Sequence, residues 1–350
     1  MTGRRLWIAG AFGAALGVCT AAHAADPQTV AKIANYDAAD RQAFLEAGAR
    51  KEGELQLYTV GSQIDPLLKA FGEKYPFLSV KAFKGDIPIV LKKLMEEYKA
   101  GVYTADAFEL DDYGVQILRD AKLLVPFSSP EMANYGTEAV EANRHWVLMR
   151  EDYASLGFNT SAYSPEDAPH AHADLLDPKW KGKLGASASE ATLINWVGAM
   201  VTAEGEDFVR KLGRQTVTLY NMGGPAVANL VVSGEVPLLM NARFSHFYAR
   251  RKMGGKVAWR ALGPSYTAMS GVGVPVRAKN PHAAMLFIDF MLSEAAQKNY
   301  TEQLGYSSLR NGMTNDSAPV KKLLLALRPN YTRDYEQWTR LADEIFRSGR

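Results

Sequence analysis

The segment from 51 to 125 switches repeatedly between two hydrophobic periodicities. Residues 55–60 and 78–83 alternate apolar and polar positions, as half-buried strands do, and 105–110 forms a short apolar strand. Apolar residues at helical spacing follow each strand, at 64–75, 90–98 and 115–118. Strands that alternate with helices are typical of a mostly parallel sheet with helices on its faces. Ligands of such sheets bind beyond the carboxyl ends of the strands, here near Thr59 and Asp111.

The rest of the chain predicts a second α/β unit and a return to the first. Strands are expected at 182–187, 216–220 and 236–242, and helices at 190–202, 206–212 and 225–232. Strands at 146–149 and 153–158 lead into this unit, and strands at 257–262 and 271–276 lead back. The predicted fold class is therefore α/β, in two units that are connected twice.

The first 24 residues carry a different pattern. Arg4 and Arg5 precede an apolar run from Leu6 to Val18, and Ala22-His23-Ala24 has the small-x-small form of a cleavage site. The apolar run is about 13 residues, which is too short to span a bilayer. We predict a cleaved signal peptide at 1–24 and a helical segment at 25–50; the choice between the general and the twin-arginine export route stays open.

Composition narrows the function classes. The chain has 350 residues, of which 47% are hydrophobic and 22% charged, enough for two domains with large cores. Without Arg4 and Arg5 it carries 38 basic and 38 acidic residues, which argues against a basic nucleic-acid-binding surface. The single cysteine, Cys19, lies in the signal segment, so no disulfide is expected. We expect a monomer.

Motifs for catalysis are absent from the sequence. There is no phosphate-binding glycine loop after a strand and no Gly-x-Ser-x-Gly turn. His170 and His172 lie in a Pro-rich loop without the usual spacing of metal ligands. Two α/β units without a catalytic constellation favour ligand binding over turnover, with no cofactor and no resident metal.

Six segments together resemble a known family. They are GELQLYTVGS at 53–62, TADAFELDD at 104–112, KWKGKLGASASEA at 179–191, VVSGEVPLLMNARF at 231–244, KNPHAAMLFIDFMLSEAAQ at 279–297 and LGYSSLRNG at 304–312. In this order they resemble periplasmic solute-binding proteins of ABC importers, in the branch of the ferric-iron-binding proteins (extracellular solute-binding family 1). The resemblance implies a periplasmic protein that delivers its solute to a membrane permease with a separate ATPase.

The resemblance also implies the type II fold of periplasmic binding proteins. Two lobes would be joined by two hinge-strand crossovers, near 153–158 and 259–266, with the ligand in the cleft between them. Lobe 1 would comprise 51–152 and 265–350, and lobe 2 would comprise 153–264. Closure of the lobes around a solute is the expected motion.

The iron ligands of that branch are mostly missing. Its adjacent tyrosine pair follows a Gly-Glu-Val-Pro stretch, which is present at 234–237, but the matching positions hold Arg243 and Phe244. Its histidine would fall near Ser62 or Gln63, and only its carboxylate finds an approximate match, in Asp111. Ferric iron prefers anionic oxygen donors, and a guanidinium would repel it. The sequence thus departs from iron binding.

Arg243 favours an anionic ligand, because a guanidinium can grip a carboxylate or phosphate with two parallel hydrogen bonds. Helix starts offer free backbone N–H groups beside it. The predicted ligand-binding residues are Arg243, Thr59, Ser62, Gln63, Asp111, Ser187, Ser189, Gly224 and Tyr266. Arg243 could instead pair with Asp111, and the serines could be ordinary N-caps. Asp111 could bind an ammonium or hydroxyl group of the ligand, or cap a helix.

Three functions remain in competition. The first is a receptor for a small organic anion such as a carboxylate, phosphonate or phosphate ester. The second is a ferric receptor that completes its site with a bound anion held by Arg243, while Asp111 and Tyr248 or Tyr266 meet the metal. The third, from another class, is an exported enzyme or a sensor subunit on the same fold.

Overall fold

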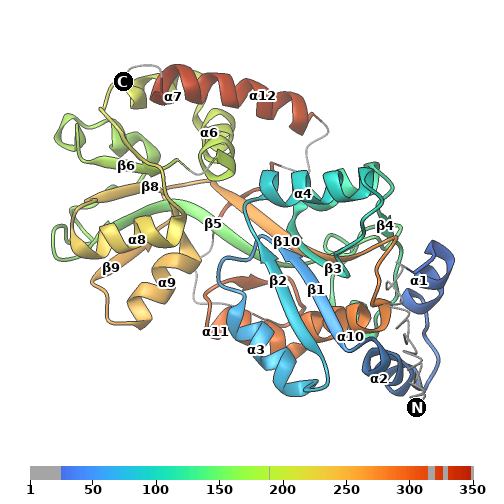
Figure 1. The fold of residues 1–350 in the computed structure, drawn as a ribbon. Coiled ribbons are helices and arrows are strands. Elements are labelled where there is room, and N and C mark those ends of the chain that lie inside the picture. Colours follow the sequence, from blue (N-terminus) through green and yellow to red (C-terminus); the bar gives the residue numbers. More distant parts are fainter. Residues whose placement is uncertain (1–24, 189, 314–319, 326–329, 348–350) are drawn as a thin grey trace, which may run out of the picture.

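The structure is a computed structural model that describes residues 25–347, except 189, 314–319 and 326–329 and the side chains of 190 and 191. The predicted signal peptide therefore lies outside the described residues. Two lobes share one mixed sheet with the strand order β2-β1-β3-β10-β5-β8-β6-β7 (Figure 1). None of the described helices combines the length and the apolar character that a bilayer crossing requires. The predicted α/β fold class is confirmed.

Lobe 1 carries the first parallel strands. Its strands are β1 (Glu54–Thr59), β2 (Ser79–Lys84), β3 (Ala107–Asp111) and β4 (Leu124–Val125). β1 pairs in parallel with both β2 and β3, as the alternation of strands and helices predicted. Its helices are α1 (Pro27–Ala34), α2 (Arg41–Glu52), α3 (Asp65–Lys74), α4 (Ile87–Lys99), α5 (Asp112–Asp120), α10 (Pro281–Leu292) and α11 (Glu294–Glu302).

Lobe 2 repeats the same construction on a smaller scale. Its strands are β6 (Leu184–Ser187), β7 (Thr218–Tyr220), β8 (Leu238–Arg243) and β9 (Val257–Arg260). β6 pairs in parallel with β7 and β8. Its helices are α6 (Glu190–Glu204), α7 (Glu206–Gly213), α8 (Gly224–Ser233), α9 (Phe244–Lys252) and α12 (Tyr331–Ala342).

Two long antiparallel strands connect the lobes. β5 (Val147–Asn159) pairs with β10 (Ser265–Pro275) from Val147 opposite Val272 to Ala154 opposite Tyr266. Met149 and Met269 belong to the hydrophobic core of lobe 1, whereas Ala154 and Tyr266 belong to that of lobe 2. Both strands therefore pass from one core to the other within a few residues. β5 is one continuous strand, where the sequence pattern predicted two.

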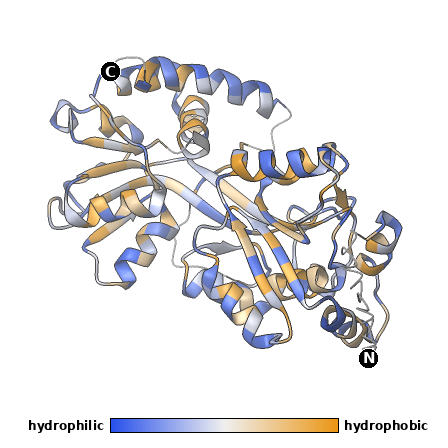
Figure 2. Ribbon diagram, in the orientation of Figure 1, coloured by the Kyte–Doolittle hydropathy of each residue, from blue (hydrophilic) through white to orange (hydrophobic). Residues whose placement is uncertain are grey.

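The C-terminal helix corrects the predicted lobe boundaries. α12 packs on α6, and its side chains Tyr331, Trp338 and Leu341 are buried in the core of lobe 2, so the assignment of 265–350 to lobe 1 is wrong for this helix. A methyl group on Gly198 of α6 would lie 2.4 Å from the ring of Trp338, so the close approach needs glycine. α12 is mostly hydrophilic or intermediate in hydropathy, and its hydrophobic residues gather toward its C-terminal end (Figure 2). The position of α12 is thus set by the fit of its buried side chains to α6, and not by the lobe to which the preceding residues belong.

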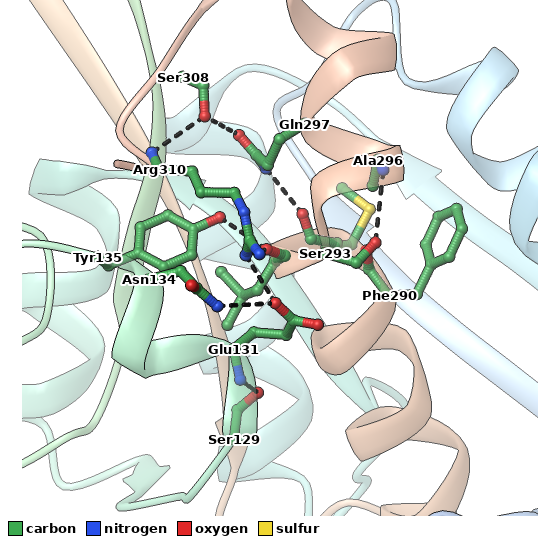
Figure 3. Close-up of polar contacts among 12 residues, drawn as sticks. Ser129, Glu131, Asn134, Tyr135, Phe290, Ser293, Ala296, Gln297, Ser308 and Arg310 are labelled. Carbon is green, nitrogen blue, oxygen red and sulfur yellow. Dashed lines mark hydrogen bonds and ion pairs between the residues drawn. The ribbon is translucent and has the colours of Figure 1, made fainter. Parts of the chain in front are cut away.

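The end of α10 is closed by side chains from three other segments (Figure 3). Arg310 donates to the carbonyl oxygen of Leu292 at 2.9 Å and to Glu131 at 2.6 Å, and the hydroxyl of Tyr135 donates to the same carbonyl at 3.0 Å. Gln297 donates to the carbonyl of Met291 at 2.7 Å. Helix ends leave carbonyls without intrahelical partners, and these contacts satisfy them. They also fix the segment next to Tyr306, which reaches the cleft.

Candidate ligand-binding cleft

A cavity of about 180 Å³ lies where the two lobes face each other. Its wall is formed by strand ends and helix starts of both lobes, as expected for an α/β sheet. Lobe 1 contributes Val60, Ser62, Asp86, Ile87, Asp111 and Tyr306, the connecting strands contribute Arg150, Asp152, Ala268 and Ser270, and lobe 2 contributes Ser187, Thr192, Gly223, Gly224, Pro225, Leu239, Asn241, Arg243, His246 and Phe247.

Arg243 is the central charge of the lobe 2 wall. It ends β8 and is the N-cap residue of α9, so the change from strand to helix presents its side chain at the cavity. Its guanidinium carbon lies 5.1 Å from the ring centre of Tyr266, in a cation–π contact. None of the carboxylates that the structure describes forms an ion pair with Arg243, so its charge is left for another partner.

The start of α8 adds backbone donors to this wall. Gly223 precedes the helix and Pro225 occupies its first turn. In the described part of the chain, the N–H groups of Gly223 and Gly224 find no acceptor, and both residues border the cavity. A methyl group on Gly224 would lie 2.5 Å from the ring of His246, whereas one on Gly223 would have no neighbour closer than 3.9 Å. Glycine at 224 thus lets the His246 ring approach the helix start.

His246 is a buried polar side chain on the cavity wall. It is 8% exposed, and no hydrogen bond joins its ring to any residue that the structure describes. Burial, together with the positive charges of Arg243 and Arg250, lowers the pKa of His246 to about 3. The ring is therefore neutral and offers one donor and one acceptor nitrogen to whatever occupies the cavity.

Ser187 is held in place by Asn241. The side-chain oxygen of Asn241 accepts from the N–H of Ser187 at 2.9 Å, and its NH₂ group donates to the Ser187 carbonyl at 3.0 Å. The Ser187 hydroxyl donates to the carbonyl of Met222 at 3.2 Å. This amide pairing joins β6 to β8 at the edge of the cavity, and Asn241 is 1% exposed. It fixes the position of the lobe 2 wall.

The lobe 1 wall carries two carboxylates, Asp111 and Asp86. Asp111 ends β3, and its side chain caps α5 by accepting from the N–H of Gly114 at 2.8 Å. Burial raises the pKa of Asp111 to about 6, against the lowering effects of that hydrogen bond and of Arg243. Asp86 occupies the N-cap position of α4 but accepts no capping hydrogen bond. Asp86 is exposed and borders the same cavity.

The connecting strands form a buried charged floor. Arg150 donates to Glu109 through Nε at 3.1 Å and through a terminal nitrogen, and the hydroxyl of Thr59 donates to the second Glu109 oxygen. Burial lowers the pKa of Arg150, but the charge of Glu109 outweighs it and raises the pKa above its ordinary value. Asp152 accepts from the backbone and the hydroxyl of Ser245, at 3.1 and 2.7 Å. These charges are satisfied within the protein.

The structure places five of the nine predicted ligand-binding residues on the cavity wall: Arg243, Ser62, Ser187, Gly224 and Asp111. Ser189 lies outside the described residues. Three others, in contrast to the prediction, do not line the cavity. Thr59 is fully buried and turned toward Glu109, Gln63 lies beside Tyr306, and Tyr266 is buried beneath Arg243.

Sequence reasoning missed Asp86, His246 and Asn241. Asp86 follows the second parallel strand and precedes an apolar helical run, which is the same signal that singled out Asp111. His246 lies three residues after Arg243, in the first turn of the helix that Arg243 caps. Asn241 lies inside a strongly apolar strand, where a buried amide indicates a fixed polar partner.

A second hollow, of about 520 Å³, lies outside the cleft between α11 and residues 310–313. Its Arg310 is already paired with Glu131 and with the end of α10 (Figure 3). It combines acidic and basic groups, among them Glu294 and Lys298, which pair with each other. The interlobe cavity, although smaller, has donors without partners among the described residues and is the candidate ligand site.

Two lobes on one sheet, joined by β5 and β10 around a polar cavity, define a binding protein for a small solute. A family model described as bacterial extracellular solute-binding protein matches residues 110–333. The chain belongs to this family.

Solved structures share the fold. Iron-bound HitA from Pseudomonas aeruginosa superposes with a TM-score of 0.70 at 23% identity, covering 84% of this chain and 99% of that one. The substrate-binding protein of an ABC transporter from Agrobacterium tumefaciens reaches a TM-score of 0.72 at 15% identity, covering 82% and 94%. A curated relative, an Fe(3+)-binding periplasmic protein of Serratia marcescens, is 24% identical over 205 residues, which are 55% of this chain and 60% of that protein.

Proposed function

We propose that this protein is the periplasmic solute-binding component of an ABC importer and captures a small organic anion, such as a carboxylate, phosphonate or phosphate ester. The observation that carries the proposal is Arg243 on the cavity wall without a carboxylate partner among the described residues. The free N–H groups at the start of α8 and the neutral ring of His246 support it, since both can donate hydrogen bonds to anionic oxygens. Delivery would be to a membrane permease with its ATPase.

Binding rather than turnover is proposed because the acidic groups of the cavity are largely occupied. Asp111 caps α5 and Asp152 holds the start of α9. His246 keeps a neutral ring at neutral pH, and its low pKa makes it a weak base. Asp86 is the one acidic group of the cavity wall without a partner among the described residues, and it is exposed, whereas a general base works best with a pKa near the operating pH.

Ferric iron is the second candidate, because the Serratia relative and HitA are an Fe(3+)-binding and an iron-bound protein. The donors differ in this chain. The described residues include no group of three or more His, Cys, Asp or Glu side chains close enough to hold a metal ion. Tyr248 donates to the Glu302 carbonyl at 2.8 Å, and Tyr266 is buried beneath Arg243. An iron site here would have to recruit an exogenous anion through Arg243.

The first test is a thermal-shift screen of purified protein, followed by calorimetry. The panel holds organic acids, phosphonates, phosphate esters, ferric chloride and ferric citrate. A ligand that binds only the folded protein stabilises it by about 2.7 kcal/mol at a hundredfold excess over Kd. A shift from one anion class supports the proposal, and a shift from ferric salts alone contradicts it in favour of iron.

Arg243→Ala should weaken binding of the anion found in that screen by about 10- to 150-fold. This corresponds to the roughly 1.5–3 kcal/mol of a hydrogen bond to a charged group. The fold should persist, because Arg243 is only half-buried and forms no ion pair with a described carboxylate. Unchanged affinity in the variant would place the anion elsewhere.

Gly224→Ala tests the helix start, with Gly72→Ala as its control. The methyl group at 224 meets the His246 ring, whereas one at Gly72, in α3 and off the cavity wall, has no neighbour within 4 Å. We expect Gly224→Ala to weaken binding of the anion by about tenfold, because the displaced His246 ring loses a hydrogen bond to a charged group, worth about 1.5 kcal/mol. Gly72→Ala should bind like the wild type. Wild-type affinity in Gly224→Ala as well would show that the start of α8 and His246 do not contact the anion.

A further inference from the structure

The two walls of the cavity carry opposite charge. Lobe 2 presents Arg243, the free N–H groups at Gly223 and Gly224, and the His246 ring. Lobe 1 presents Asp86 and Asp111. A ligand that touches both walls in a cavity of about 180 Å³ must satisfy both kinds of group at once. The proposed anion satisfies only the lobe 2 wall.

An anionic ligand without a positively charged group would leave Asp86 without a binding partner. An aspartate at an N-cap normally accepts from an N–H of the first helical turn, and Asp86 accepts none. Within the described residues, no lysine, arginine or histidine forms an ion pair with it. Asp111 differs, because its carboxylate is engaged with Gly114. Asp86 is therefore an exposed carboxylate on the cavity wall without a partner among the described residues.

We propose that the ligand is a zwitterion, with its anionic group on the lobe 2 wall and a protonated amine held by Asp86. The ligand class is a small amino acid or an aminoalkyl phosphate or phosphonate. An ammonium donates three hydrogen bonds and matches a carboxylate that has no donor of its own. A plain anion would instead meet the repulsion of Asp86. This inference rests on the proposed anion site and adds the second recognition group.

The inference is tested with ligand pairs that differ only by the amine. The pairs are β-alanine and propionate, phosphoethanolamine and ethyl phosphate, and 3-aminopropylphosphonate and propylphosphonate. Calorimetry should show that the protein prefers the amine-bearing member of one pair by about tenfold or more, the fold-change of a charge-assisted hydrogen bond. Equal or tighter binding of the amine-free member in every pair that binds would overturn the inference and leave the anion receptor standing.

Asp86→Asn should reduce that preference to about threefold or less, by weakening the amine-bearing member and by removing the repulsion that the amine-free member meets. Glu96→Gln is the matched control, since it removes the same charge from α4 but lies off the cavity wall and should keep the preference. Arg243→Ala should weaken both members of the pair. A preference that survives Asp86→Asn contradicts the role of Asp86. If no member of any pair and no other anion binds, the proposed function fails and the zwitterion with it.

Discussion

The two walls of the cleft differ in how their charges are balanced inside the protein. On the lobe 1 side, Glu109 holds Arg150 and Asp111 caps a helix, so most charges there have protein partners. On the lobe 2 side, Arg243 has no carboxylate partner among the described residues. A charge that is satisfied internally supports the fold, and one that is left open supports binding. The comparison assigns Glu109, Arg150 and Asp111 to the structural part of the cavity, and leaves Arg243 and the uncapped Asp86 for recognition.

Removing Glu109 should break the buried ion pair beneath the cavity and cause the largest loss of stability among the changes predicted here. Glu109→Ala leaves the buried Arg150 charge without its partner, which costs about 3–5 kcal/mol of unfolding free energy. Urea denaturation measures this loss. Glu54→Ala is the control, because its pair with Lys81 is exposed and is expected to contribute no more than about 1 kcal/mol. Comparable losses in both variants would show that the floor is not a buried ion pair in solution.

The pH dependence of stability should distinguish buried Asp111, whose pKa is raised, from an ordinary surface acid. Burial raises its pKa from 3.8 to about 6, so the folded state binds the proton more tightly than the unfolded state. The stability that protonated Asp111 contributes to the folded state is therefore lost as pH rises from about 4 to about 6. Asp111→Asn should gain about 1–3 kcal/mol over the wild type between pH 4 and 6.5, while the asparagine oxygen keeps the cap. Unfolding curves that run parallel across this range would show an unshifted carboxyl.

A contact outside the cavity should set how closely the walls approach. The hydroxyl of Tyr248 and the ammonium of Lys252, both in lobe 2, donate to the carbonyl of Glu302 at the end of α11 in lobe 1, at 2.8 and 2.7 Å. A methyl group on Gly305 would lie 2.6 Å from Tyr248. We expect Gly305→Ala to disturb this interlobe contact.

Gly312→Ala is the control for that change. Both glycines have left-handed φ, +74° and +76°, but a methyl group on Gly312 meets open space. The shared backbone strain cancels, and overpacking should cost Gly305→Ala about 1–2 kcal/mol more. Thermal unfolding of the two variants measures the difference. Equal melting temperatures would mean that α9 and α11 separate freely in solution.

Much of the fold could be predicted because its signals are local. The alternation of period-two and helical segments gave the parallel strands of lobe 1, and Asp111 and Gly53 stand where α5 begins and α2 ends. Arg243 could be found because a strand end followed by a helix defines the cleft edge of an α/β sheet. These features depend on residues close together in the chain.

The direction of individual side chains could not be predicted in the same way. Thr59 and Ser62 lie three residues apart at one strand end, yet Thr59 turns inward to Glu109 and Ser62 faces the cavity. That choice depends on Glu109 and Arg150, which lie 50 and 91 residues further along the chain. The placement of α12 on lobe 2 likewise depends on the space that Gly198 leaves for Trp338.

The sequence by itself determined the α/β architecture, the two connections between the lobes and the arginine at the edge of the cleft. These features follow from hydrophobic periodicity and strand ends, which depend only on residues close together in the chain. The tertiary structure alone decided which carboxylates have partners and which do not. Asp86 and Asp111 have the same local sequence setting, a strand followed by a helix start, but only Asp111 bonds to its own helix. The partners that distinguish them come together only when the chain has folded and distant segments share one cavity.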